Sequence, residues 1–213
     1  MDISKEIEFC VKTVPPLSEG LLNSYANLPQ DNYLQENQIF RRRRFSIAKL
    51  KNSKINTETQ TKFFQDDTIN HYAGGLDRIF EPLETAVRDE FISIYLSCIS
   101  PIFGDPDSEI GLHQIRITCE DEYVGHPVPE GWHTDGFDFV AIVCVAGSNF
   151  SGGTSRIKSD LELDHDSFSR TLKPTEMLIF NDRKYFHHTD PINNLRRGEM
   201  GYRDILVITI SIL

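Results

Sequence analysis

The pattern of apolar positions changes character near the middle of the chain. In the first half, apolar side chains recur at helical spacing over residues 81–100, which predicts a helix that Pro101 and Gly104 end. A shorter helix is expected over residues 17–28, with Ser18 as its N-cap. Residues 40–51 alternate between apolar and polar positions and predict a strand. The first half is therefore expected to combine helices with strands.

The second half predicts strands throughout. Apolar and polar residues alternate over residues 113–120, and a long apolar run covers residues 137–146. Further short strands, bounded by turn residues, are expected at 152–157, 176–180, 185–189 and 203–213. Upstream, residues 59–64 are expected to add a strand and residues 71–75 a loop. Helices followed by many strands indicate an α+β chain, mainly β, whose second half is a β-sandwich or jelly roll.

Length and composition favour one globular domain. The chain has 213 residues, of which 39% are hydrophobic and 10% aromatic, and this is enough to form a large core. No repeat, low-complexity tract or linker divides it. We therefore expect residues 1–213 to form a single domain, in which residues 1–110 support a jelly-roll core of residues 111–213 that carries the functional site.

Charge and cysteine usage disfavour several classes of function. The formal net charge of −10 argues against a nucleic-acid partner, because phosphates repel an acidic surface. The four arginines at 41–44 are the one basic run, interpreted here as a solvated or salt-bridged strand end. No apolar run is long enough for a membrane span. Because the cysteines are scattered in apolar surroundings and the N-terminus lacks the pattern of a signal peptide, a cytoplasmic protein with reduced thiols is expected.

A His-x-Asp pair, His133 and Asp135, precedes the longest apolar run. In an extended strand, residues i and i+2 face the same side, so the imidazole and the carboxylate would converge. With a second histidine, such a pair forms the facial triad that holds non-haem Fe(II) and leaves coordination positions open. A second His-Thr-Asp lies at residues 188–190, but Pro191 follows it at once and no histidine lies after it. The first copy is therefore the favoured metal site.

The third ligand is expected from another strand, where His187 and His188 are the candidates. Neighbouring residues on a strand face opposite sides, so only one of them can reach the metal, and the local pattern leaves both open. The remaining histidines are interpreted as ordinary, partly exposed side chains: His71, His113, His126 and His165.

Arg203 lies at the beginning of the β-branched C-terminal strand. A cation that enters an apolar strand needs an anionic partner, because burying it alone is costly. Its guanidinium could hold the far carboxylate of a bound diacid through two parallel hydrogen bonds. It could equally form a salt bridge with the adjacent Asp204 or another acid at the end of the strand.

Several blocks of sequence form a recognisable set. They begin at Gln114 (QIRI), Pro129 (PEGWHTDGFDFV), Asn149 (NFSGGTS), Asp182 (DRKYFHHTDPI) and Tyr202 (YRDILV), with an upstream block at Asn70 (NHYAGGLDRIF). In this order they resemble the Fe(II)/2-oxoglutarate-dependent dioxygenases of the bacterial amino-acid hydroxylase type, the type of L-isoleucine 4-hydroxylase. The resemblance extends from about residue 40 to the end of the chain.

The resemblance implies a double-stranded β-helix, a cupin-like jelly roll, with N-terminal helices packed on it. In the block that begins at Asp182, the spacing of the family pattern implies His187 as the third ligand beside His133 and Asp135. The resemblance also favours Arg203 as the 2-oxoglutarate anchor. The implied cofactors are Fe(II), 2-oxoglutarate as co-substrate and O2, with succinate and CO2 as products. The implied substrate is a free L-amino acid or a related small metabolite.

An amino-acid substrate needs one cationic and one anionic partner. Arg116, with Gln114 on the same strand face, is the candidate for its carboxylate, and Glu130 or Asp138 for its ammonium. Two other functions stay open: the same chemistry on a peptide, protein or carrier-bound residue, and a non-catalytic β-sandwich binding module in which His-x-Asp is structural. No GxSxG or paired Cys/His signature supports a hydrolase.

Overall fold

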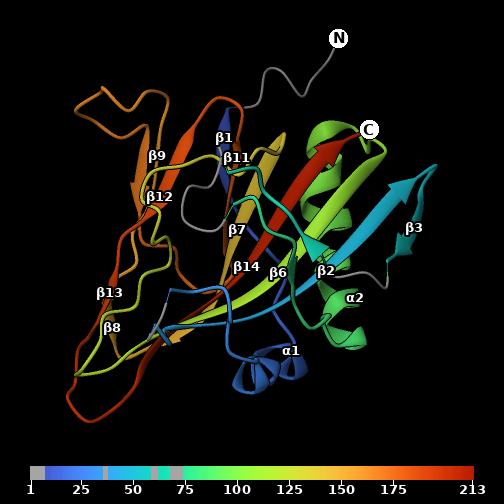
Figure 1. Ribbon diagram of the computed structural model, residues 1–213. Helices are drawn as coiled ribbons and strands as arrows, with labels where there is room; N and C mark the ends of the chain where they lie inside the picture. The colour runs from blue at the N-terminus through green and yellow to red at the C-terminus, as the bar shows by residue number, and fades with distance from the viewer. Residues whose placement is uncertain (1–7, 36–37, 59–61, 68–73) are drawn as a thin grey trace.

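The computed structural model describes residues 8–35, 38–58, 62–67 and 74–213. Within them the fold is mainly β and is built around one large antiparallel sheet with the strand order β1-β11-β7-β14-β6-β2-β3 (Figure 1). Its strands are β1 Phe9–Thr13, β2 Arg41–Lys51, β3 Lys54–Thr57, β6 Ser108–Cys119, β7 Phe139–Ser148, β11 Glu176–Asn181 and β14 Gly201–Ile212. This sheet is consistent with the jelly-roll core that the sequence predicts.

Smaller sheets lie across one face of the large sheet, and the helices lie on its other face (Figure 1). One small sheet has the order β10-β9-β12, and two-stranded pairs join β13 to β8 and β4 to β5. The strands are β4 Lys62–Phe63, β5 Arg78–Ile79, β8 Phe150–Gly152, β9 Ser155–Lys158, β10 Phe168–Arg170, β12 Phe186–Thr189 and β13 Ile192–Asn194. The large sheet is thus a central layer between helices and small sheets.

Side chains of the large sheet alternate between these two environments. On β14, Leu206 and Ile208 pack into the core cluster that contains the helices, whereas Ile205 and Val207 turn to the opposite face. Strand β7 is buried on both faces over most of its length, which explains its nearly continuous apolar sequence. The face of the large sheet that is turned away from the helices forms the floor of the cavity described below.

The first helix matches its prediction. Helix α1, Glu19–Ser24, begins after Ser18, whose hydroxyl oxygen accepts a hydrogen bond from the Leu21 amide at 3.1 Å. This is the arrangement expected of an N-cap. A 3-10 turn, Tyr25–Asn27, continues the helical segment to the end that the sequence predicts.

The second helix changes form along its length. Helix α2, Thr85–Ile94, is followed by a π-helical turn, Tyr95–Ile99, and a 3-10 turn, Ser100–Phe103. Pro101 lies inside the 3-10 turn rather than ending the helix, since proline is tolerated at the beginning of a helical turn. The chain leaves the helical conformation at Gly104.

The strands predicted outside residues 59–64 are confirmed, although β6 begins earlier than the predicted residues 113–120. Among the described residues the structure adds strands that were not predicted: β1, β3, β5, β8, β10 and β13. The predicted strand at 59–64 lies partly outside the described residues, which include only β4 of it, as does most of the predicted loop at 71–75. Because β1, β2 and β3 lie in the same sheet as the strands after residue 110, the two parts of the chain share one core. No described helix has the length and apolarity to span a membrane.

Candidate metal centre

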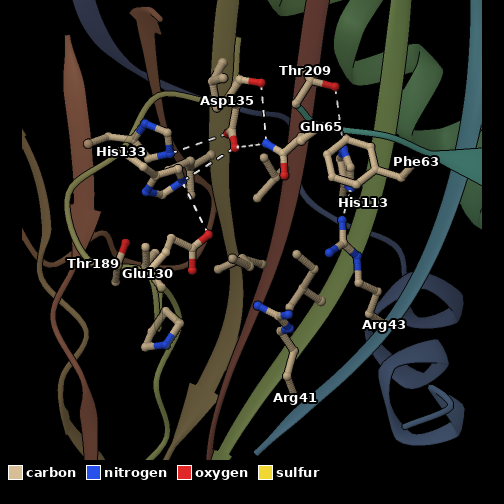
Figure 2. Close-up of a pocket in the computed structure, with 18 of the residues that line it drawn as sticks. Arg41, Arg43, Phe63, Gln65, His113, Glu130, His133, Asp135, Thr189 and Thr209 are labelled. Atoms are coloured by element: carbon tan, nitrogen blue, oxygen red, sulfur yellow. Dashed lines mark hydrogen bonds and ion pairs between the residues drawn. The ribbon is translucent and has the colours of Figure 1, made fainter. Parts of the chain in front are cut away.

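The two segments that carry the candidate ligands are joined through their backbones. The His133 amide donates to the His187 carbonyl at 3.1 Å, and the His187 amide donates to the His133 carbonyl at 2.8 Å. The two imidazole centroids lie 4.0 Å apart. Asp135 completes the group, with one carboxylate oxygen 3.5 Å from His133 Nε2 and the other 3.4 Å from His187 Nε2 (Figure 2). One ligand atom from each residue lies within 4.8 Å of the others.

The loop that carries His133 and Asp135 is shaped by two glycines and one buried acid. Gly131 and Gly136 adopt positive φ values of 83° and 86°, which side chains with a Cβ rarely adopt. The pair therefore lies in a turn before β7 and not in an extended strand as the sequence predicted. The carboxylate of Asp182 accepts hydrogen bonds from the amides of Asp135, Gly136 and Phe137 at 2.7–3.1 Å. This acid holds the turn in place.

Contacts at Nδ1 of the two histidines turn the Nε2 atom of each ring toward Asp135. His133 Nδ1 donates to the Gly131 carbonyl at 3.0 Å. His187 Nδ1 lies 3.5 Å from the carboxylate of Asp182. The donor set of two imidazoles and one carboxylate is the set that non-haem iron takes.

The charges around this group favour a cation at its centre. Burial by itself would raise the pKa of Asp135, but hydrogen bonds and charges from His133 and His187 hold it well below its usual range. Burial would also lower the pKa of His187, but its contacts with Asp135 and Asp182 raise it to about 10. In the metal-free protein the protonated His187 faces the deprotonated carboxylate of Asp135, and a metal ion would take the place of that proton. The residues therefore fit Fe(II).

His188 and the second His-Thr-Asp lie outside the metal group. The ring of His188 packs 5.5 Å from that of Trp132, and its Nε2 lies 3.8 Å from Asp190. Both carboxylate oxygens of Asp190 accept hydrogen bonds from Arg156 at 2.9 and 3.0 Å. The Asp of this second motif is therefore held in a salt bridge with Arg156 of β9. Among the described residues, His133, Asp135 and His187 are the only such group.

The metal group opens into a cavity with about 770 Å³ of empty space, counted out to the solvent at its mouth. Its floor is the face of the large sheet turned away from the helices, and Pro127, Val128 and Glu130 form part of its wall. Arg41 and Arg43 also line it, each less than a tenth exposed. The prediction of a solvated or salt-bridged strand end for residues 41–44 is therefore wrong for Arg43, whereas Arg41 is paired with Asp31 at 2.7 Å.

Strand alternation explains this placement, because Arg41 and Arg43 point to the cavity while Arg42 and Arg44 point away from it. Arg43 donates to Nδ1 of His113, which is 2% exposed and so is not the partly exposed histidine that the sequence suggested. Burial and the nearby Arg43 charge lower the pKa of His113 well below its usual value, so its ring is neutral. Burial also lowers the pKa of Arg43 to about 9, which shows the cost of keeping this cation in the cavity without an anion.

A family model for 2OG-Fe dioxygenases matches residues 22–209, which is most of the chain and includes all of the groups described above. The chain belongs to the 2OG-Fe dioxygenase family. The family uses Fe(II), 2-oxoglutarate and O2, and the donor set of His133, Asp135 and His187 suits the iron.

Solved structures agree with this family. A BsmA homologue from Methylobium petroleophilum is 28% identical, with a TM-score of 0.84 over 97% of this chain and 89% of that one. IDO from Bacillus thuringiensis is 20% identical, with a TM-score of 0.75 over 100% and 96% of the two chains. TqaL, an Fe(II)/α-ketoglutarate-dependent dioxygenase, is 15% identical, with a TM-score of 0.62 over 91% and 73%. No curated protein sequence matches the chain.

Arg203 of this dioxygenase is buried without an acidic partner in the described structure. It is 1% exposed, its Nη2 lies 3.4 Å from the hydroxyl of Ser155, and Nε and Nη1 have no hydrogen-bond acceptor among the described residues. The alternative of a salt bridge with Asp204 is excluded, because adjacent strand residues point to opposite faces and Asp204 is paired with Arg116. Burial lowers the pKa of Arg203, so an anion brought to it would be stabilised.

The structure brings only one of the four predicted substrate residues to the cavity. Glu130 lines it, with Oε1 3.8 Å from His133 Nε2. Arg116 is held by both oxygens of Asp204 at 2.7 Å, and Gln114 donates to the hydroxyl of Ser24 at 2.7 Å. Arg116 and Gln114 point toward the helices. Their neighbours on β6, His113 and Ile115, face the cavity instead. Asp138 accepts from Arg183 at 2.6 Å and from the Ile212 amide at 2.9 Å, which ties the end of β14 to this loop.

Sequence reasoning missed several residues of the site. Arg43 could have been found from the alternation of β2, in which Phe45 and Ile47 share its face. Arg78 begins the two-residue strand β5 and Gln65 lies two residues after the two-residue strand β4, so neither belongs to a periodic pattern. Only their position in space reveals them.

Proposed function

We propose that this dioxygenase oxidises a free L-amino acid, or a closely related small metabolite, as the L-isoleucine 4-hydroxylase type does, on a double-stranded β-helix core. In this proposal His133, Asp135 and His187 hold Fe(II). With 2-oxoglutarate and O2 bound, the iron supplies the oxidising power for a C–H bond. One oxygen atom enters succinate, the other enters the hydroxyl group of the product, and CO2 is released. The unpaired cysteines are compatible with a cytoplasmic location.

Arg203 is proposed to anchor 2-oxoglutarate through the carboxylate far from the iron. The buried guanidinium has two nitrogens, Nε and Nη1, without an acceptor in the described part of the chain. A carboxylate bound in parallel to Nη2 and to either of them would supply one of the missing acceptors. A fixed cation at this place selects a diacid over a monoacid co-substrate, because an unpaired buried charge is costly. The neighbouring Ser155 hydroxyl can add a hydrogen bond to the same carboxylate.

The observation that carries the substrate class is the distribution of charge in the cavity (Figure 2). Arg43 and Arg78 are buried cations, each with an unpartnered Nε among the described residues, and they suit a carboxylate. Glu130 is an anion beside the metal group and suits an ammonium. A zwitterionic amino acid matches both signs of charge.

The protein's own residues would position the substrate and exclude water. The apolar side chains of Val140, Ile142, Ile205 and Val207 line the cavity beside the charged groups. An amino acid held at its charged end would keep its side chain against these residues and near the metal group. Positioning of this kind accounts for much of the rate enhancement that proteins give to cofactor chemistry.

The test is succinate formation with Fe(II), 2-oxoglutarate and a panel of the twenty standard L-amino acids, with and without O2. We expect iron- and oxygen-dependent succinate with at least one amino acid, and much less with its N-acetyl and methyl-ester derivatives, which remove one charge each. No such succinate with any member of the panel would contradict the substrate class. Strong activity on the capped derivatives would favour the alternative of a peptide or carrier-bound residue.

Variants of the charged residues test the binding mode. Arg43→Met and Glu130→Gln are each expected to raise the KM of the accepted amino acid by about tenfold or more, since a charged hydrogen bond contributes roughly 1.5–3 kcal/mol. Arg88→Met is the matched control, because Arg88 lies on α2 and pairs with Asp89 away from the cavity. An unchanged KM in both cavity variants would mean that the amino acid binds at another site.

A further inference from the structure

Gln65 connects the candidate iron ligand to a cavity arginine. Its side-chain nitrogen donates to Asp135 Oδ1 at 2.9 Å, and its side-chain oxygen accepts from Arg78 Nη2 at 2.5 Å (Figure 2 shows the contact with Asp135). Gln65 and Arg78 are 5% and 3% exposed, so both contacts are shielded from water. The three side chains form a continuous chain from the cavity to the metal group.

One end of this chain acts on the carboxylate that would hold iron. Asp135 Oδ1, which accepts from Gln65, is also the oxygen that lies 3.5 Å from His133 Nε2. A donor on a ligating carboxylate fixes its orientation and withdraws electron density from it, which weakens its attraction for the metal. Gln65 is therefore placed to set both the geometry and the strength of this ligand.

The other end is open to a ligand. The guanidinium of Arg78 lines the cavity and lies over the ring of Phe63 at 4.6 Å, and its Nε has no acceptor among the described residues. An acidic group that binds Arg78 would compete with Gln65 for this cation. In a low-dielectric site, hydrogen bonds in series polarise one another, so a change at one end is felt at the other.

We propose that the chain Arg78–Gln65–Asp135 reports the arrival of the substrate's acidic group to the iron ligand, with Gln65 as the positioning residue. This role rests on the proposed function for the identity of that acidic group. When a carboxylate binds Arg78, the Arg78–Gln65 hydrogen bond weakens, Gln65 becomes a weaker donor, and Asp135 becomes a stronger ligand. The metal site thus responds to the substrate without direct contact between the substrate's carboxylate and the metal.

The test is a double-mutant cycle on metal binding, with Co(II) as an oxygen-stable probe. The affinity for Co(II) and its visible absorption with 2-oxoglutarate are measured for the full-length wild-type protein, Gln65→Met, Arg78→Met and the double variant. We expect Arg78→Met to change the affinity by about threefold or more when Gln65 is present, and by less than about twofold when it is absent, as coupled neighbours do. Equal effects in both backgrounds would overturn the proposal.

A second variant separates the loss of the Gln65 hydrogen bond from misfolding of the protein. Gln65→Glu keeps the shape of the side chain and an acceptor for Arg78 but cannot donate to Asp135, and it adds a negative charge beside the ligand. We expect its affinity for Co(II) to rise by at least about threefold, because an added negative charge beside the site attracts the metal cation. An unchanged affinity in a protein whose thermal unfolding matches that of the wild type would mean that position 65 does not act on the ligand.

The cycle is independent of the substrate, so it separates this inference from the proposed function. Additive effects would refute the connection even if amino acids are oxidised, and coupled effects would support it even if the amino-acid panel fails. With an accepted amino acid, Gln65→Met should leave its KM within about threefold while raising the ratio of succinate formed to amino acid oxidised, because the site no longer responds to the substrate. A lower kcat with an unchanged ratio would instead indicate a merely structural role.

Discussion

The backbones of His133 and His187 are hydrogen-bonded to each other in both directions, and this bridge determines which of two adjacent histidines reaches Asp135. His187, directly opposite His133, turns its ring to the metal group. One residue later, His188 points to the other side of β12 and packs against Trp132. A two-stranded register therefore resolves a choice that the linear pattern leaves open.

This register predicts different outcomes for the two histidines. His187→Ala should abolish stoichiometric binding of Fe(II) or Co(II), because it leaves only two protein ligands, whereas His188→Ala should keep it. The measurement is metal content after anaerobic loading, with circular dichroism to check the fold. Retained binding in His187→Ala together with lost binding in His188→Ala would show that the register is shifted by one residue.

Arg203→Met should raise the KM for 2-oxoglutarate by about tenfold to a hundredfold, since the variant loses a charge-assisted hydrogen bond in a buried place. Arg88→Met serves again as the matched control on α2. Steady-state succinate formation at varied 2-oxoglutarate provides the measurement. An unchanged KM would place the co-substrate anchor at another cation, with Arg196 and Arg197 as the next to test.

The sequence predicted those features that depend on local spacing. The alternation of β2, the helical period of residues 81–100 and the His-x-Asp pair are each encoded within a few residues. The faces of β6 were harder, because both are buried and the pattern does not say which one meets the cavity. Arg116 and Gln114 were therefore expected in the cavity, while their neighbours His113 and Ile115 occupy it.

Residues brought in by distant segments could not be predicted from spacing. Asp182 follows β11 and supports the turn at Asp135 through backbone amides, which any sequence can offer. Arg78 lies on β5 and Gln65 follows its partner β4, and the pairing of these short strands depends on tertiary contacts. Such residues are defined by the fold as a whole, and only the assembled structure identifies them.

Asp182→Asn should weaken metal binding by about tenfold to a hundredfold, the usual effect of changing a group that orients metal ligands. The amide keeps one acceptor for the turn amides but removes the charge next to His187 Nδ1. Asp190→Asn is the matched control, because Asp190 pairs with Arg156 away from the metal group. Co(II) titration measures the effect, and equal affinities in the two variants would contradict the role of Asp182.

His113 should make the metal-free protein less stable in acid. Its pKa is well below the usual value in the folded state, so the unfolded chain takes up a proton below pH of about 6.5 that the folded protein does not. This contribution is present above pH of about 6.5 and is lost as the pH falls, by up to about 1.4 kcal/mol per pH unit. The stability advantage of the wild type over His113→Gln should therefore shrink between pH 7.5 and 5.5 in urea unfolding. A constant difference across this range would mean that His113 is not held neutral.

The pair of Arg116 and Asp204 should affect stability and leave the site intact. Arg116→Met leaves the carboxylate of Asp204, which is 1% exposed, without its bidentate partner, so we expect the free energy of unfolding to fall by about 3–5 kcal/mol. Arg116→Met combined with Asp204→Leu should recover most of this loss, because both charges are then absent. Urea unfolding measures stability, and succinate formation measures the KM for 2-oxoglutarate and for the amino acid, both expected within about twofold of the wild type in the double variant. A tenfold rise in the KM of the amino acid would instead support the interpretation, made from the sequence, that Arg116 binds the substrate.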